Sequence, residues 1–133
     1  KSKKTFFVFN AHYDHQGMVA RVESSNLVLK KIKEIAGDAP VVFMGDLNGG
    51  RDTEWYLGLA SSVLLKDSFT MVDRPYQLNG SFNGFNTNQV RKDVIDHVFV
   101  SKHFKANRWA VLTDTYFGKY PSDHFPVFVE IIF

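Results

Sequence analysis

The chain has 133 residues, of which 44% are hydrophobic, and this size and composition suit one compact domain with its own core. The charge is nearly balanced, with 16 basic and 14 acidic residues, so it neither predicts nor excludes binding to nucleic acid. The absence of cysteine excludes a disulfide scaffold and a thiolate metal site, and no apolar run reaches the roughly 20 residues of a membrane span.

The first third of the sequence predicts a strand, a helix and a second strand. Residues 5–11 favour a strand that runs into a polar cluster around His12. Residues 18–36 predict an amphipathic helix, whose apolar positions are Val19, Val22, Leu27, Leu29, Ile32 and Ile35. Residues 41–44, Val-Val-Phe-Met, are typical of a buried strand. This β-α-β order predicts parallel or mixed pairing within a layered α/β fold.

The rest of the sequence predicts a second helix, a long loop and three further strands. Residues 52–69 favour a helix that Asp52 caps, with Trp55, Leu59 and Val63 on its buried side. Residues 74–92 are rich in asparagine, glycine and aromatics and predict a long loop. Residues 93–101, 109–117 and 125–133 alternate as strands do. Without repeats or linkers, we expect residues 1–133 to form a single domain.

Polar side chains gather where the predicted strands begin or end: His12, Asp46, Asn48, Asp96, His97, Asp123 and His124. Each has an ordinary explanation by itself, because Gly-Asp-x-Asn is typical of a turn and a lone histidine is usually structural. If the strand ends converge, however, the same side chains form a pocket of oxygen and nitrogen atoms suited to a hard divalent cation and a phosphate. Metal-assisted hydrolysis requires such a set.

Four motifs in order resemble those of the endonuclease/exonuclease/phosphatase (DNase I-like) superfamily: "NAHYDH", "GDLN", "IDHVFVS" and "SDHFPV", between residues 10 and 127. The resemblance implies an α/β fold, namely the second half of a four-layer α/β sandwich, with a mixed, mostly antiparallel sheet flanked by helices. It implies a divalent-metal-dependent phosphoester hydrolase, either a phosphodiesterase or nuclease or a phosphatase. The expected cofactor is Mg²⁺ or Mn²⁺.

The resemblance also implies roles for individual residues. Asp46 would position or deprotonate the attacking water, and Asn48 would bind a phosphate oxygen and hold Asp46 in place. Asp96 would orient His124, which would stabilise charge on the phosphoryl group. His12 would be a second donor to that group. By its alternation along the strand, His97 should face the opposite side of the sheet from Asp96 and be structural.

Further residues are expected to bind the metal or the substrate. Asp123 would contribute to the metal site together with Asp46. The predicted substrate-binding residues are Asn10, Asp14, Phe82, Asn83 and Arg91. The aromatic side chains of the long loop could stack on a base or a sugar, or could simply pack the loop onto the domain. The substrate could be nucleic acid, a phospholipid head group or a sugar phosphate.

The family's first half, which carries the principal glutamate ligand of the metal, would precede residue 3. We therefore expect this chain to be the C-terminal portion of the domain, weakly active alone, with its own N-terminal half or a second copy as partner. A non-catalytic module that binds phosphate, nucleic acid or protein is the alternative. The chain begins with Lys1, so a leader could have been removed. If a leader was removed, the protein would be exported or periplasmic, and if none was removed it would be cytoplasmic. The compartment stays unknown.

Overall fold

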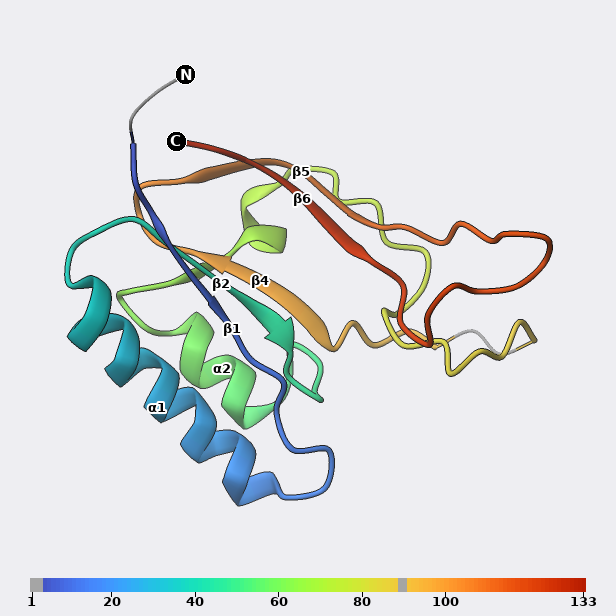
Figure 1. Cartoon of the computed structure of the whole chain (residues 1–133), viewed down its shortest axis with the longest axis horizontal. Coiled ribbons are helices and arrows are strands. Elements are labelled where there is room, and N and C mark those ends of the chain that lie inside the picture. Colours follow the sequence, from blue (N-terminus) through green and yellow to red (C-terminus); the bar gives the residue numbers. More distant parts are fainter. Residues whose placement is uncertain (1–3, 89–90) are drawn as a thin grey trace.

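A computed structural model describes residues 4–88 and 91–133 (Figure 1). The elements in chain order are β1 (Phe7–Asn10), α1 (Met18–Ala36), β2 (Val41–Asp46), α2 (Glu54–Ala60), β3 (Lys66–Asp67), the 3-10 helix η1 (Ser68–Met71), β4 (Asp96–Val100), β5 (Lys105–Val111) and β6 (Val127–Ile132). The mixture of helices and strands confirms the predicted α/β class. None of these helices is long and apolar enough to cross a membrane.

Four strands form one sheet in the order β1-β2-β4-β3, and β5 and β6 form a separate antiparallel pair. The β1–β2 pair is parallel, whereas the β2–β4 and β3–β4 pairs are antiparallel, so the sheet is mixed and mostly antiparallel, as predicted. Strand β2 lies between two neighbours and begins with three buried residues, Val41, Val42 and Phe43. The β2–β4 register places Asp46, the last residue of β2, opposite Asp96, the first residue of β4.

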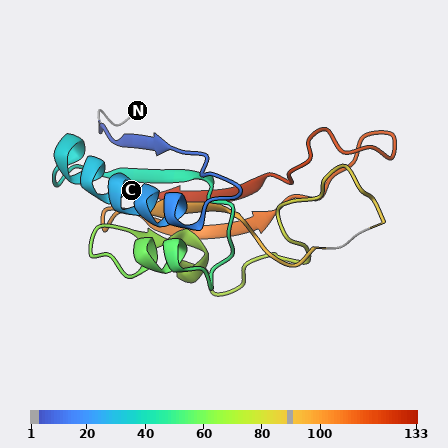
Figure 2. The same ribbon diagram turned by 90° about the horizontal axis from the view of Figure 1, so that it is seen from below.

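The main core lies between the sheet and the two helices. Phe43 of β2 and Phe99 of β4 are fully buried there, with their rings 6.1 Å apart, beside Leu59 of α2. On the opposite face, Val42 and Val100 pack in a second cluster that includes residues near β5 and β6. Figure 2 shows that the long loops extend beyond the strands at the end where β2 terminates. The sheet thus has a packed end and an end surrounded by loops.

Helix α1 has the predicted bounds, but half of its predicted apolar face is wrong. Val19, Leu27 and Ile35 are 76%, 54% and 56% exposed, while the buried positions include the polar residues Arg21 and Ser25. The helix turns this polar stripe inward because it meets hydrogen-bonding groups on Tyr13 and Trp55, which lie under it. The Ser25 hydroxyl contacts the Tyr13 hydroxyl at 3.1 Å and donates to the Trp55 carbonyl at 2.9 Å.

Helix α2 is much shorter than the predicted 52–69, because it ends at Ala60 and the chain then turns into β3 and η1. Trp55 and Leu59 are buried as predicted, but Val63 is 97% exposed. Thr53, not Asp52, is the N-cap residue, and its hydroxyl donates to the Gly50 carbonyl instead of capping the helix. The strand predicted at 109–117 is also wrong in its bounds, since β5 covers Lys105–Val111.

Candidate active site

Three potential ligand side chains meet at the end of strands β2 and β4. The carboxylates of Asp46 and Asp96 and the imidazole of His124 each offer one atom to a group whose members lie within 4.8 Å of one another. All three side chains are partly buried. His124 comes from the segment before β6, which pairs with Phe82 through an isolated antiparallel bridge. The ends of β2 and β4 and the segment before β6 therefore converge, which is the condition on which the predicted pocket depended.

The imidazole of His124 lies between the two carboxylates. Its Nδ1 is 2.8 Å from Asp96 Oδ2, and its Nε2 is 3.8 Å from Asp46 Oδ2. Because an ionised carboxylate only accepts hydrogen bonds, Nδ1 carries the proton and donates a hydrogen bond to Asp96. This fixes the ring's orientation and directs Nε2 towards the side of Asp46. Asp96 thus holds His124 in one orientation.

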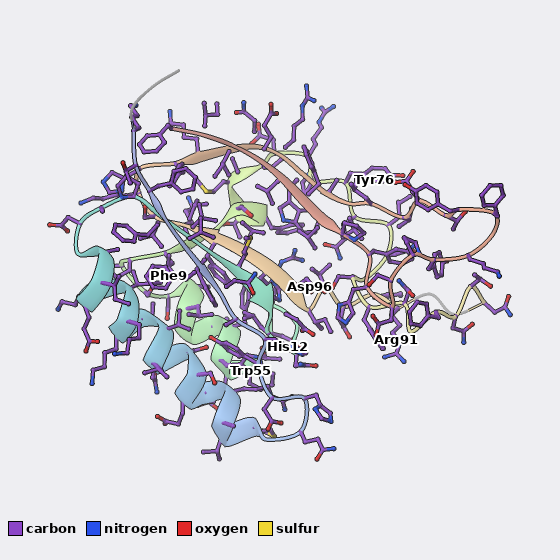
Figure 3. All side chains as sticks on the ribbon, viewed as in Figure 1. Phe9, His12, Trp55, Tyr76, Arg91 and Asp96 are labelled. Atoms are coloured by element: carbon purple, nitrogen blue, oxygen red, sulfur yellow. The ribbon has the colours of Figure 1, made fainter. Side chains whose placement is uncertain are left out.

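A second histidine reaches Asp46 from the loop after β1. His12 Nε2 lies 3.3 Å from Asp46 Oδ2, and its side chain is 73% exposed. Figure 3 places His12 and Asp96 at the same end of the strands, with Arg91 further out on the side of the long loops. Asp46 Oδ2 is therefore near two imidazole nitrogens, one on an exposed side chain and one on a side chain held by Asp96.

The pKa values of Asp46 and His124 are both raised, but for different reasons. Burial raises the pKa of Asp46, and the nearby Asp96 carboxylate raises it further, against the opposing hydrogen bond from Asn48 N–H. Burial alone would lower the pKa of His124, but the hydrogen bond and charge of Asp96, with the charges of Asp46 and Asp123, outweigh it and raise this pKa. The carboxylate is thus a stronger base than usual, and the imidazolium is favoured.

The turn after β2 holds Asp46 through backbone contacts. The Asn48 N–H donates to Asp46 Oδ1 at 2.8 Å, and the Asn48 side-chain amide donates to the Tyr13 carbonyl at 2.8 Å. Leu47, between them, is fully buried in the core. Gly45 has a φ of +149°, and a Cβ there would collide with the Ala11 carbonyl oxygen. The turn therefore requires glycine at this position because the neighbouring backbone passes too closely.

Two positioning residues were missed at the level of the sequence. Arg21 of α1 stacks on Trp55, with its guanidinium carbon 4.2 Å from the ring centroid. Its Nη1 donates to three backbone carbonyls, those of Asp14, His15 and Asn48, at 3.3–3.4 Å. It thereby ties the loop after β1 to the turn after β2. A basic residue in a helix is normally expected on the surface, so only its buried contact with the Trp55 ring identifies the role of Arg21.

The second missed residue is Ser81, which is fully buried beside Asp96. Its hydroxyl oxygen accepts hydrogen bonds from the N–H groups of Ile95 at 2.9 Å and Asp96 at 3.1 Å. Its carbonyl accepts from the Phe125 N–H at 2.6 Å, next to His124. Ser81 thus holds the backbone of Asp96 and that of Phe125, the residue after His124, and its place after Gly80 gave no signal of this.

The remaining residues predicted for the metal or the substrate are spread more widely. The Asp123 carboxylate accepts from the Ser122 hydroxyl at 3.5 Å and is outside the Asp46–Asp96–His124 group. Asp14 Oδ1 accepts from the N–H groups of Gly17 and Gln16 just before α1, and these bonds lower its pKa. Asn10 is exposed at the end of β1. The functional roles of these residues stay predictions.

The predicted substrate residues of the long loop lie beside His124. The Phe82 ring meets the His124 ring edge-on at 5.0 Å between centroids, and the Arg91 guanidinium lies 4.5 Å from the Phe82 centroid. Asn83 is buried, and its amide donates to the Ser122 carbonyl while its oxygen accepts from Phe85 N–H. Asn83 thus joins the long loop to the segment that carries His124.

His97 is structural, as predicted. It is 2% exposed, and its ring packs on Tyr56 of α2 at 4.8 Å. Its Nε2 is 2.9 Å from the Gly49 carbonyl, which only accepts hydrogen bonds, so Nε2 carries the proton. The bond ties β4 to the turn that follows β2. His97 therefore supports the site from the helical side of the sheet.

The comparisons with known proteins identify the family of the chain. The family model described as "Endonuclease/Exonuclease/phosphatase family" matches residues 2–124. A mannosyl-6-phosphatase from Bacteroides thetaiotaomicron VPI-5482 is 42% identical with a TM-score of 0.91, and the match covers 98% of this chain and 52% of that chain. An endonuclease/exonuclease/phosphatase family protein from Bacteroides thetaiotaomicron is 43% identical with a TM-score of 0.92, covering 98% and 51%. The chain belongs to the endonuclease/exonuclease/phosphatase family.

A more distant structure shows the same fold. D. rerio TDP2 complexed with a single-strand DNA product is 21% identical with a TM-score of 0.76, and the match covers 99% of this chain and 58% of that chain. The chain spans about half the length of the two Bacteroides thetaiotaomicron proteins described above. A search of curated proteins found no match. The DNase I-like fold expected from the four motifs is thus confirmed.

Proposed function

We propose that the protein containing this chain is a divalent-metal-dependent phosphoester hydrolase. The observation that carries the proposal is the arrangement of His124 between Asp96 and Asp46, with Nδ1 2.8 Å from one carboxylate and Nε2 3.8 Å from the other. This geometry supplies a base and an oriented donor on one side of a shallow site. Both are required when water attacks a phosphate ester.

Asp46 is the group that orients the attacking water and takes its proton. Its Oδ1 is occupied by the Asn48 N–H, so Oδ2 is the oxygen that faces the site. Burial and the adjacent Asp96 raise the pKa of Asp46, which strengthens it as a base. As a general base works best when its pKa approaches the working pH, the shift is in the direction that helps the reaction.

His124 and His12 stabilise the charge that develops on the phosphoryl oxygens. Asp96 holds His124 Nδ1–H, which leaves Nε2 free to donate to the phosphate, and the raised pKa of His124 favours its protonated form. His12 approaches from the exposed side and supplies a second donor. Preoriented donors of this kind stabilise the transition state without having to reorganise during the reaction.

The donor set fits a hard divalent cation, because carboxylate oxygens are the ligands that Mg²⁺ and Mn²⁺ prefer. Asp46 and Asp96 would hold such an ion from this chain, and Asp123 would need a different side-chain orientation to join them. When bound, the ion neutralises the charge of the phosphoryl group and lowers the pKa of water. Asp46 still acts on the attacking water, and His124 and His12 still act on the phosphoryl oxygens.

The first substrate to test is a sugar phosphate monoester. This choice rests on the 42% identity to the mannosyl-6-phosphatase from Bacteroides thetaiotaomicron VPI-5482. The test measures phosphate release from mannose 6-phosphate and nitrophenol release from p-nitrophenyl phosphate and its bis-p-nitrophenyl diester. The full-length gene product is assayed with Mg²⁺, with Mn²⁺ and with EDTA.

We expect metal-dependent hydrolysis that EDTA abolishes, with the monoesters preferred over the diester. Preference for the diester would support the proposed hydrolase activity but overturn the choice of a sugar phosphate as substrate. A folded, metal-loaded protein that hydrolyses none of the three esters would contradict the proposed function. In that case the phosphate-binding module without catalysis becomes the better explanation.

A further inference from the structure

A pocket of about 490 Å³ opens beside His124, and the proposed chemistry leaves it without a role. It is lined by Phe82, Arg91, Lys92, Asp93 and Ile95. Phe82 is the link between the pocket and the site, because its ring contacts His124 and its backbone pairs with the backbone of His124. Phe82 thus lies between the His124 imidazole and this pocket.

The arginine in this pocket is already oriented. The Arg91 guanidinium lies 4.5 Å from the centroid of the Phe82 ring, within the range of a cation–π contact. A guanidinium stacked by its flat face keeps the N–H groups along its edge available, and those groups match the geometry of a phosphate or carboxylate. One aromatic ring separates this guanidinium from the His124 imidazole.

The pocket also has an excess of positive charge. Arg91 and Lys92 contribute two cations and Asp93 one carboxylate. Among the residues that the structure describes, neither cation lies within ion-pair distance of a carboxylate, although the same chain pairs Arg51 with Asp67 and Arg108 with Glu130. The backbone around them is fixed, since the Arg91 carbonyl accepts from Gly80 N–H and the Asp93 carbonyl from Ser81 N–H.

We propose that this pocket binds a second anionic group of the substrate, so that the preferred substrate is a small phosphate ester carrying a further phosphate or carboxylate. Arg91 holds that group through its edge N–H donors, and Lys92 adds a second positive charge. Asp93 accepts hydrogen bonds from hydroxyl groups between the two anions. The inference rests on the proposed function, because it assigns the first phosphate to the Asp46–His124 site.

The alternative occupant is the apolar face of a sugar stacked on Phe82. Arg91 already covers one face of that ring in this structure, so a sugar would have to stack on the other face or displace a cation–π contact. An anion leaves that contact in place, because it binds the N–H donors of the guanidinium and not the ring, and Arg91 is an exposed residue. The geometry therefore favours an anionic group over a neutral sugar at this position.

The test measures binding in a background where turnover is strongly reduced. In full-length Asp46→Asn, the dissociation constants of glucose 6-phosphate, glucose 1,6-bisphosphate and 6-phosphogluconate are measured by calorimetry. We expect at least one of the two ligands with a second anion to bind about tenfold more tightly than glucose 6-phosphate, as a charge-assisted hydrogen bond would provide. Addition of Arg91→Gln should remove this preference.

Arg108→Gln is the matched control, because it removes the same charge from an exposed arginine on β5 that does not line the pocket. The preference should survive in that variant. Equal affinity for all three ligands, or a preference that persists in Arg91→Gln, would overturn the inference. Wild-type hydrolysis is measured separately, so failure of the proposed function and failure of this inference give different results.

Discussion

Replacement of Ser81 by alanine tests how the site is held together. The fully buried Ser81 hydroxyl accepts hydrogen bonds from two backbone N–H groups, those of Ile95 and Asp96. A buried donor that loses its partner costs about 1–3 kcal/mol, so Ser81→Ala should lower the free energy of unfolding by about 2–6 kcal/mol. Ser68 provides a matched control: it is also fully buried, but its hydroxyl makes one hydrogen bond, donated to the Val98 carbonyl.

The assay is urea unfolding of the full-length protein and of the two variants, followed by circular dichroism. Ser68→Ala should cost about 1 kcal/mol, close to the net value of one hydrogen bond. Ser81→Ala should cost at least twice as much. The reasoning is refuted if Ser81→Ala unfolds within 1 kcal/mol of the wild type, or if Ser68→Ala is the more destabilising of the two.

Three further changes test other parts of the account. Asp96→Asn should lower kcat about 10–100-fold, because a charge-assisted hydrogen bond is lost. It should also move the alkaline limb of the pH–rate profile to lower pH, because the pKa of His124 falls without the charge of Asp96. An unchanged profile would contradict this. Burial lowers the pKa of His97, so the unfolded chain takes up a proton that the native state does not, and stability should fall as the pH drops below 6.5. His97→Gln should reduce that loss in urea titrations, and an equal loss would count against it. Gly45→Ala should cost more than about 3 kcal/mol or prevent soluble expression, because its Cβ meets the Ala11 carbonyl; near-normal stability would exclude that collision.

The candidate site residues could be selected because they stand at strand ends within four family-like motifs, whereas the convergence of those ends was an assumption. Asp46 is the last residue of β2, and Asp96 is the first residue of β4. The two carboxylates meet because β4 is the antiparallel neighbour of β2. The position of Leu47 followed from the alternation of side chains along a strand, and it is fully buried. The burial of Leu47 is a local feature, whereas the meeting of Asp46 and Asp96 depends on the pairing of two strands that are far apart in the chain.

The buried face of α1 could not be predicted, because it depends on what the helix packs against. Hydrophobic spacing favoured Val19 and Leu27, yet Arg21 and Ser25 are the buried residues. Their burial is favourable only because Trp55 offers a ring and a carbonyl beneath them. Ser81 escaped prediction for the same reason, since its partners are 14 and 15 residues away.

The measurement that tests the central claim most directly is the turnover of a phosphate monoester by full-length Asp46→Asn at saturating metal. Asp38→Asn is the matched control, because Asp38 is an exposed aspartate in the turn between α1 and β2. Loss of a general base should lower kcat about 10²–10⁴-fold in Asp46→Asn, while Asp38→Asn keeps wild-type turnover. A folded Asp46→Asn protein with wild-type turnover would contradict the role given to Asp46.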